Sequence, residues 1–439
     1  MQLSKHNIIS KIKDSENYFI INLLSGNADI LEPEVGRAVL DGKIPDEKAF
    51  TENGYLVDAG QEEILFRKKY LEFIDKRESD EIQIFFVPWY ACNFNCSYCY
   101  QSEYENSRQQ ITKNVIDAFF SNIQKQFEGR NYYVTLFGGE PLLSGAYQRY
   151  IIEYFLTSAT NKNISVAIVT NGYQLSEYVP LLAKSNIREV QVTLDGPREI
   201  HNARRPLKGS NNGTFDKIVQ GIDAALEARL RVNFRVVLDK QNIEYLKELA
   251  SFAKIRGWTQ NPLFKTQLGR NYELHHCSSN PDNLYSRIEL YEKIYELTKT
   301  NPEILEFHKP AYSIARFLSE NGQLPDPLFD ACPGCKTEWA LDYTGGIYSC
   351  TATVGKTDEQ LGTFYPEVKL DDEQVSQWRE RDITTIAKCG SCPNSLACGG
   401  GCGSVAKNDS GSLSSPDCRP IKELLELGIS TYFSENGTN

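Results

Sequence analysis

Three cysteines stand close together in the segment WYACNFNCSYCY, residues 89–100. Cys92, Cys96 and Cys99 have C-x3-C-x2-C spacing, and thiolates at such short spacing are ligands of iron-sulfur clusters or of zinc. A 4Fe-4S cluster takes four ligands, so three on one loop leave one iron open. The same three cysteines make an incomplete zinc site. The spacing therefore favours a cluster with an open iron over a zinc knuckle or a purely structural cluster.

The overall composition narrows the class of protein. The 439 residues carry a formal charge of −11, which argues against the basic surface expected of a nucleic-acid binder. No apolar stretch resembles a signal sequence or approaches the ~18 residues that suggest a membrane span. These features predict a cytoplasmic protein with neither a nucleic-acid nor a membrane partner. Because the cytoplasm keeps thiols reduced, the twelve cysteines point to metal binding rather than to disulfides.

Residues 1–80 contain no cysteine and are predicted to form a small domain of their own. Apolar runs at 17–24 and 28–31 flank a Ser-Gly-Asn turn and predict a hairpin, and Pro33 favours the start of a helix. A second helix is predicted at 61–76, with one face formed by Ile64, Leu65, Leu71 and Ile74. An open sheet edge can capture an extended peptide by strand addition, although the pattern alone favours a packing domain without a ligand.

Residues 81–270 alternate between strand and helix patterns. The clearest helix is predicted at 112–127, and the strands are predicted at 82–87, 132–137, 164–170, 190–194, 232–238 and 263–268. Six such units predict an α/β fold whose parallel sheet curves into a partial (β/α)6 barrel. Loops after parallel strands carry the chemistry. The cysteine loop follows the first strand, and FGGEP, TNG and LDGP follow the next three. Residues 271–328 are predicted to be a helical bridge, and 329–439 a cysteine-rich domain held by metal.

The cysteine loop, with its aromatic neighbours Phe94, Tyr98 and Tyr100, resembles the signature of the radical S-adenosylmethionine (SAM) enzymes. The resemblance extends over residues 82 to about 270, where the predicted barrel and the motifs after its strands agree with that family. It implies that the amino and carboxylate groups of SAM chelate the open iron. One electron from the reduced cluster then splits the sulfonium, giving methionine and a 5′-deoxyadenosyl radical that abstracts hydrogen.

The resemblance also implies which residues contact SAM. The segment after the second strand matches the motif that binds the SAM amino group, and it consists of Gly138, Gly139, Glu140 and Pro141. Asn171 and Asp195 follow the next two strands and could hold the ribose hydroxyls, although turn residues that cap the next helix are an equal interpretation. Arg204 or Arg205 could meet the SAM carboxylate, but solvated charges are the default expectation.

Eight cysteines near the C-terminus resemble the SPASM domain, an extension of radical SAM enzymes that act on peptides and proteins. The resemblance implies two fully liganded 4Fe-4S clusters that favour electron transfer, which makes three clusters in all. One cluster would take Cys332, Cys335, Cys350 and Cys402, and the other Cys389, Cys392, Cys398 and Cys418. A pair of zinc ribbons is the competing interpretation. The remaining thiol, Cys277, lies beside His275 and His276 and is predicted to be structural because no further ligands are in sight.

The function follows from the combination of these parts. Sulfatase maturases carry an Asp directly after the cysteine that is Cys350 here, where it acts as a base; this chain has Thr351, so no catalytic base is assigned. The N-terminal domain resembles instead the winged-helix-like element with which peptide maturases recognise a precursor, and this favours strand addition over mere packing. The overall layout looks most like the streptide-type cyclases, which join the β-carbon of a Lys to indole C7 of a Trp.

The resemblance implies two partners, namely a precursor peptide with a leader sequence and a one-electron reductant such as flavodoxin or ferredoxin. A thioether between a Cys sulfur and a peptide carbon is the nearest alternative product, since it requires the same parts. A protein that binds metal and peptide without chemistry is disfavoured, because FGGEP would then have no task.

Overall fold

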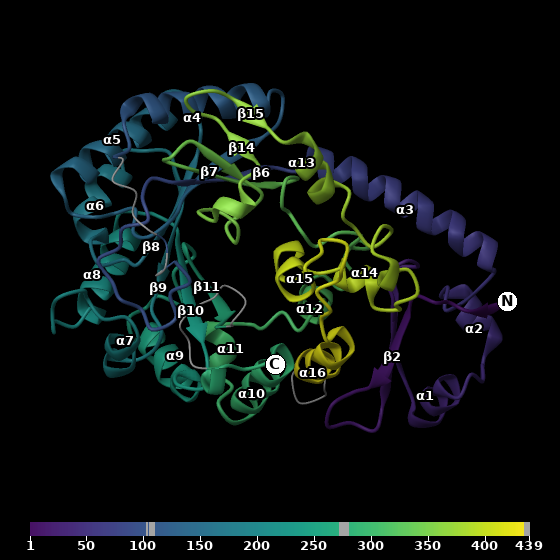
Figure 1. Ribbon diagram of the computed structural model, residues 1–439. Helices are drawn as coiled ribbons and strands as arrows, with labels where there is room; N and C mark the ends of the chain where they lie inside the picture. The colour runs from purple at the N-terminus through teal and green to yellow at the C-terminus, as the bar shows by residue number, and fades with distance from the viewer. Residues whose placement is uncertain (102–103, 105–109, 272–280, 434–439) are drawn as a thin grey trace.

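The computed structural model describes residues 1–101, 104, 110–271 and 281–433. Cys277, His275 and His276 lie outside these ranges. Figure 1 shows a curved sheet with helices on its outer side, an N-terminal domain at the other end of the molecule, and the C-terminal segment between the two. Within the described ranges, no helix is both long enough and apolar enough to cross a membrane.

The N-terminal domain contains a three-stranded antiparallel sheet, which confirms the predicted hairpin. The strands are β2 (Asn7–Lys11), β3 (Tyr18–Asn22) and β4 (Asn27–Leu31), and a short pair joins β1 (Gln2–Leu3) to β5 (Leu56–Val57). The helices are α1 (Pro33–Leu40), α2 (Glu47–Glu52) and α3 (Ala59–Ser79). Pro33 occupies the first turn of α1, where its missing N–H has no cost. The Asp58 carboxylate caps α3 by accepting from the N–H groups of Gly60 and Gln61.

Helix α3 is longer than predicted, and its predicted apolar face is only partly right: Leu65 and Ile74 are partly buried, but the other two residues are exposed. Ile64 and Leu71 are 62% and 63% exposed. The side that packs also contains aromatic residues that were not predicted: Phe66 and Tyr70 lie with ring centroids 5.1 and 5.3 Å from that of Phe329. Phe329 lies more than 250 residues further along the chain, so no local period of aliphatic residues on α3 could reveal which face it covers.

Six parallel strands form the barrel wall in chain order, as the sequence predicted. They are β6 (Ile82–Val87), β7 (Tyr132–Leu136), β8 (Val166–Thr170), β9 (Ile187–Thr193), β10 (Val232–Leu238) and β11 (Phe264–Arg270). The helices between them are α4 (Lys113–Gln126), α5 (Ala146–Asn161), α6 (Leu175–Leu182), α7 (Arg198–Arg204), α8 (Phe215–Glu227) and α9 (Leu246–Ile255). Phe86 of β6 is fully buried against Phe119 and Phe155 of the outer helices, so alternate β6 side chains face inward.

The sheet does not end at β6, which the sequence did not predict. Strand β12 (Glu338–Asp342) pairs in parallel with β6, and β13 (Gly346–Tyr348), β14 (Gly362–Thr363) and β15 (Lys369–Leu370) extend the sheet to ten strands. Trp339 and Trp378 are buried in the same hydrophobic core as the barrel. The first part of the C-terminal segment is therefore stabilised by apolar burial as well as by its cysteine-rich loops.

The remaining helices connect the barrel, the cysteine-rich loops and the N-terminal domain. They are α10 (Arg287–Thr300), α11 (Ile304–Phe307), α12 (Ala315–Asn321), α13 (Asp372–Arg379), α14 (Ser395–Cys398), α15 (Gly403–Ser410) and α16 (Ile421–Phe433). Ser286 and Glu289 form a capping box at the start of α10. Glu426 of α16 accepts a hydrogen bond from the N–H of Lys13 at 3.2 Å, so α16 lies against the β2 side of the N-terminal sheet.

Candidate functional site

The cysteine loop after β6 is held by backbone hydrogen bonds on both sides. On one side, Gly139 N donates to Trp89 O at 3.2 Å and Glu140 N to Ala91 O at 2.9 Å. On the other side, the segment after α7 accepts, with Asn95 N donating to Pro206 O at 2.9 Å. The loops after the first, second and fourth strands thus fix the positions of the three cysteines.

The two glycines of FGGEP are required by this close approach. A Cβ on Gly139 would lie 2.3 Å from Ala91 O and 2.4 Å from Tyr90 O, and both are backbone atoms. Gly138 has φ +123°, and a Cβ there would lie 2.7 Å from Trp89 O. Only glycine lets the two backbones pack this closely, so the motif serves first to position the cysteine loop.

Glu140 lies under the loop rather than facing open space. It is 1% exposed, and its carboxylate accepts from Leu142 N at 2.8 Å, Thr170 Oγ1 at 2.6 Å and Asn171 N at 2.5 Å. Burial raises the pKa of this carboxyl group, and the three hydrogen bonds oppose that rise. The side chain therefore ties FGGEP to the end of β8. Pro141 follows it at the turn toward the buried Leu142.

Asn171 and Asp195, the two predicted ribose contacts, lie in different surroundings. The amide of Asn171 donates to Asn93 Oδ1 at 2.7 Å and lies 3.9 Å from Cys92 Sγ, so it reaches the cysteine loop directly. Asp195 is fully buried; one carboxylate oxygen accepts from Val237 N at 2.9 Å and the other from the Tyr98 hydroxyl. Asp195 thus supports the loop through Tyr98, with both of its oxygens engaged inside the protein.

The expectation that Arg204 and Arg205 are solvated charges is wrong, because they are only 3% and 8% exposed. Arg204 Nη1 contacts both carboxylate oxygens of Asp239, at 2.7 and 2.8 Å. Arg205 donates to the Tyr98 hydroxyl at 2.6 Å, while its buried Nε has no hydrogen-bond partner in the part of the chain that the structure describes. Arg204 Nε also has no hydrogen-bond partner among the described residues, but it lies 3.5 Å from Asp195 Oδ2. Since buried donors are nearly always paired, Arg205 is the one of the two that can still serve a bound anion.

The thiols of the loop suit a site occupied by iron. Burial raises the pKa of Cys92 to about 12 and of Cys96 to about 11, and the Arg205 charge opposes the rise at Cys96. At neutral pH both thiols stay protonated unless a cation compensates the thiolate charge. An iron-sulfur core supplies that compensation. The buried thiolates would be compensated by the iron of a cluster, and the unpaired Arg205 N–H could bind the carboxylate of a ligand on that cluster.

The eight C-terminal cysteines fall into two neighbourhoods. Burial raises the pKa of each of these thiols for which a shift is resolved, and neighbouring thiolates add to the rise at four of them. The charge of Cys402 raises the pKa of Cys332, and the charge of Cys332 raises that of Cys335. Both Cys332 and Cys402 raise the pKa of Cys350. In the second neighbourhood, the pKa of Cys389 is raised by the charges of Cys398, Cys392 and Cys418. Among the described residues, no three His, Cys, Asp or Glu side chains converge closely enough to hold a single metal ion.

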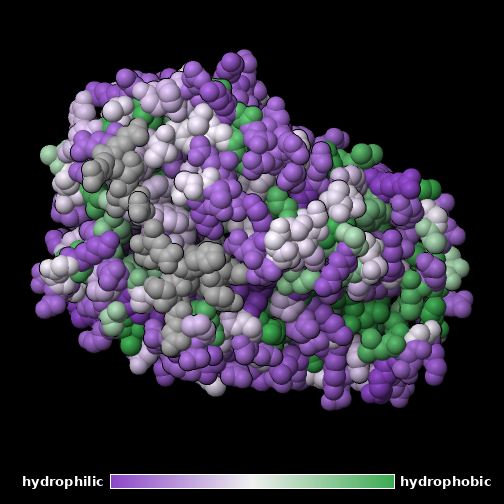
Figure 2. Space-filling model, viewed as in Figure 1, coloured by the Kyte–Doolittle hydropathy of each residue, from purple (hydrophilic) through white to green (hydrophobic). Residues whose placement is uncertain are grey.

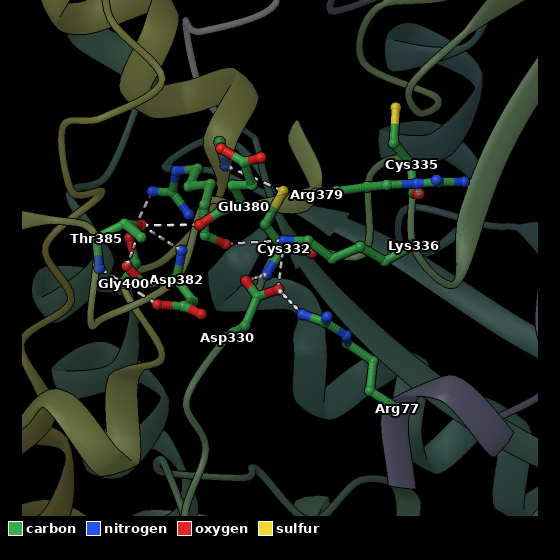
Figure 3. A network of polar contacts seen from close by, with 12 residues as sticks. Arg77, Asp330, Cys332, Cys335, Lys336, Arg379, Glu380, Asp382, Thr385 and Gly400 are labelled. Atoms are coloured by element: carbon green, nitrogen blue, oxygen red, sulfur yellow. Dashed lines mark hydrogen bonds and ion pairs between the residues drawn. The ribbon is translucent and has the colours of Figure 1, made fainter. Parts of the chain in front are cut away.

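Cationic side chains surround the first of these groups (Figure 3). Lys336, whose side chain is only 3% exposed, opposes the burial that raises the pKa of Cys332 and Cys335. Arg379 Nε donates to Cys335 O at 3.1 Å and acts on the pKa of Cys335 in the same sense. Because four thiolates on a cluster carry net negative charge, buried cations beside them are what such a centre requires.

Sequence reasoning did not single out Glu338 or Lys336. The Glu338 side chain accepts from the Thr351 N–H at 3.0 Å and from the Thr351 hydroxyl at 3.4 Å. It therefore places a carboxylate next to the position at which sulfatase maturases carry an Asp. Both residues lie in or near β12, whose pairing with β6 no local pattern indicated, so the sequence contained no signal that would have brought them to the site.

Residues 86–253 match the Radical SAM superfamily. Over this segment the chain has the radical SAM domain. Its relatives include the mycofactocin maturase MftC of Mycobacterium tuberculosis (strain ATCC 25618 / H37Rv), 23% identical over 71% of this chain and 76% of the relative. A cysteine-type anaerobic sulfatase-maturating enzyme of Clostridium novyi (strain NT) is 27% identical over 37% of this chain and 45% of its own.

Solved structures share the fold of this chain. The structure of anSMEcpe with bound AdoMet superposes with a TM-score of 0.61 and 17% identity over 80% of this chain and 93% of that one. SuiB of Streptococcus suis bound to the precursor peptide SuiA has a TM-score of 0.55 and 17% identity, and covers 96% of this chain and 99% of its own. The match to SuiB extends the shared fold to nearly the whole chain.

Proposed function

We propose that this enzyme is a maturase of a ribosomally made precursor peptide and forms an intramolecular crosslink, a carbon–carbon bond between the β-carbon of a Lys and indole C7 of a Trp. The observation that carries the proposal is architectural. The N-terminal sheet, the barrel and the cysteine-rich end occur together over almost the full length shared with SuiB, which was solved with a precursor peptide. Two further relatives support a peptide or protein substrate, since MftC is a maturase and anSMEcpe has been solved with peptides bound.

The N-terminal sheet offers one edge for a leader peptide. Its outer strands are β2 and β4, and α16 covers the β2 side through Glu426. On β4, Ile30 is 51% exposed, and Figure 2 shows hydrophobic residues gathered on this end of the molecule. An extended peptide that pairs with β4 would bury Ile30 and complete the open edge.

The chain's own residues would divide the work at the first cysteine loop. When bound there, SAM and a 4Fe-4S cluster on Cys92, Cys96 and Cys99 supply the means to abstract a hydrogen atom from the peptide. FGGEP and Asn171 hold the loop in place, and the unpaired N–H of Arg205 is available for the SAM carboxylate. Asp195 and Tyr98 keep Arg205 in position.

The crosslink requires that the peptide lose two hydrogens. One leaves as an atom, which the SAM-derived adenosyl group takes up as 5′-deoxyadenosine. After the new bond forms, the other leaves the ring as a proton and an electron. That electron balances the one consumed in cleaving SAM, so the reaction needs no further oxidant. The C-terminal cysteines, as ligands of two closed clusters, would provide the acceptor for it.

Tandem mass spectrometry of a candidate precursor after anaerobic reaction tests the product. A loss of two hydrogens that maps to a Lys and a Trp supports the proposal. A loss that maps to a Cys and a partner residue would establish the thioether alternative instead. An unmodified peptide in a reaction that still forms 5′-deoxyadenosine would reject the peptide as substrate.

A separate experiment tests the recognition role of β4. Ile30→Lys should weaken precursor binding at least tenfold, because a charge replaces the apolar side chain that the peptide would cover. Leu40→Lys is the matched control, since Leu40 is 53% exposed in the same domain but lies on α1. Equal loss of affinity in both variants, or no loss in Ile30→Lys, would reject the role of β4. Deleting residues 1–80 is a poorer test, because the packing of α3 on Phe329 would be lost.

A further inference from the structure

A buried ionic network links the N-terminal domain to the first pair of C-terminal cysteines (Figure 3). Arg77 at the end of α3 points to Asp330, with Nη1 3.7 Å from Oδ2. The ammonium of Lys336 contacts the same carboxylate oxygen. The other oxygen accepts from Cys332 N at 2.9 Å. The side chains of Asp330 and Lys336 are 1% and 3% exposed and lie in the wall of a cavity of about 660 Å³, which Arg77 also lines.

Lys336 is fixed in place by this network. Besides Asp330, its ammonium donates to Cys332 O at 3.3 Å and to Arg381 O at 2.8 Å, which uses all three donors. The charge is therefore held beside the backbone of Cys332 and has no freedom to turn away. Arg77 adds a second cation on the far side of Asp330 and keeps that carboxylate from neutralising Lys336 completely.

Stability alone is a weak reason for such an arrangement. Removing two charges from water costs about as much as their attraction returns, so a buried ion pair adds little net stability. Its effect on a neighbouring buried charge is larger, because burial lowers the local dielectric and weakens screening. The reduction potential of an iron-sulfur cluster depends on net charge and hydrogen bonds around its sulfurs. A fixed cation next to two of the four ligands favours the reduced, more negative form.

We propose that Lys336, with Arg77 as a second cation, raises the reduction potential of the centre on Cys332, Cys335, Cys350 and Cys402, and that the Asp330 carboxylate partly offsets this effect. This makes that centre a better electron acceptor than it would be without the cation. The inference rests on the proposed function, because it concerns a centre that would take the electron that the peptide releases. It also gives α3 a second task, since Arg77 belongs to the helix that joins the N-terminal domain to the barrel.

The test is a redox titration of the reconstituted full-length enzyme, followed by electron paramagnetic resonance. Lys336→Met removes the charge while keeping the length of the side chain, and should change the ratio of reduced to oxidised centre at least tenfold. For one electron this is a fall of about 59 mV in one midpoint potential. Asp330→Asn should move the same midpoint upward. Opposite signs are the signature of an electrostatic role, since damage to the site would move both variants the same way or lose iron.

The adjacent residue on α3 provides the matched control. Lys76 pairs with Asp326 at 2.9 Å, but both side chains are exposed, at 62% and 73%, so Lys76→Met should leave every midpoint unchanged. If Lys336→Met loses iron, Arg77→Gln decides the matter: a smaller downward shift supports the inference and no shift overturns it. The inference is also overturned if Lys336→Met and Asp330→Asn both keep their iron and either leave the midpoint potential unchanged or shift it in the same direction. The titration needs no peptide, so shifted potentials together with an unmodified precursor would reject the proposed function alone.

Discussion

Replacing Gly139 by Ala tests whether the close packing of FGGEP on the cysteine loop controls the site. The added Cβ would lie 2.3 Å from Ala91 O and 2.4 Å from Tyr90 O. Non-bonded heavy atoms settle at about 3.5 Å, so the two backbones must separate by about 1 Å. Ala91 directly precedes Cys92, and the displacement therefore reaches the first predicted ligand.

A shift of this size has two measurable consequences. Overpacking of a buried contact lowers the free energy of unfolding by about 1–3 kcal/mol, which urea denaturation of the enzyme can detect. A misplacement of about 1 Å at a reacting centre costs on the order of 10²-fold in rate. We therefore expect Gly139→Ala to form 5′-deoxyadenosine from SAM about 100-fold more slowly after anaerobic reconstitution and reduction.

Gly390→Ala is the control for a glycine beside a cysteine loop. Gly390 adjoins Cys389, has helical backbone angles, and a Cβ there meets only Ala387 O, at 3.6 Å. This variant should keep its iron content and its rate of SAM cleavage. If Gly139→Ala also kept both, the reasoning that ties FGGEP to the geometry of the loop would be refuted.

Three further predictions concern other parts of the chain. Burial, with a smaller contribution from Lys5, lowers the pKa of His6 to about 4, so the unfolded chain alone binds this proton as pH falls from 6.5 toward 4. Stability present above pH 6.5 should be lost over that window by up to about 3 kcal/mol relative to His6→Phe, as measured by the pH dependence of urea unfolding. Arg205→Lys should weaken SAM binding at least tenfold in equilibrium dialysis with iron content unchanged, and wild-type affinity would exclude a carboxylate contact. Cys92→Ala and Cys398→Ala should each hold about 8 Fe per chain instead of about 12, but only Cys92→Ala should abolish SAM cleavage; iron content at the wild-type level would contradict the ligand assignment.

Local patterns predicted much of the barrel because its strands are short apolar runs, which can be recognised without knowing their distant partners. All six predicted strands are present in chain order, and the loops after them meet at the cysteine loop. The glycines of FGGEP were also recognisable, because close backbone approach leaves a direct mark on the sequence. The role of Glu140 was not, since its partners Thr170 and Asn171 belong to the next strand end.

Predictions failed where a residue's environment is set by a remote segment. The sequence of α3 contains both aliphatic and aromatic side chains, and the packing against the distant Phe329 decides which of them are covered. In the sequence, Arg204 and Arg205 resemble ordinary surface charges. In the structure they are buried, where Arg204 pairs with Asp239 and Arg205 donates to Tyr98. Strand β12 is five residues long and pairs with a strand some 250 residues earlier, so it carries no strong pattern of its own.

The sequence by itself therefore determined the chemistry that this protein can host. The spacing of Cys92, Cys96 and Cys99 is a covalent property of a short segment, and so are the strand patterns that place a loop after each strand. The tertiary structure alone decided how that chemistry is supported, by placing Arg205 beside Cys96 and Lys336 beside Cys332. The physical reason is that burial and electrostatic fields depend on which segments pack together, and those partners are far apart in the chain.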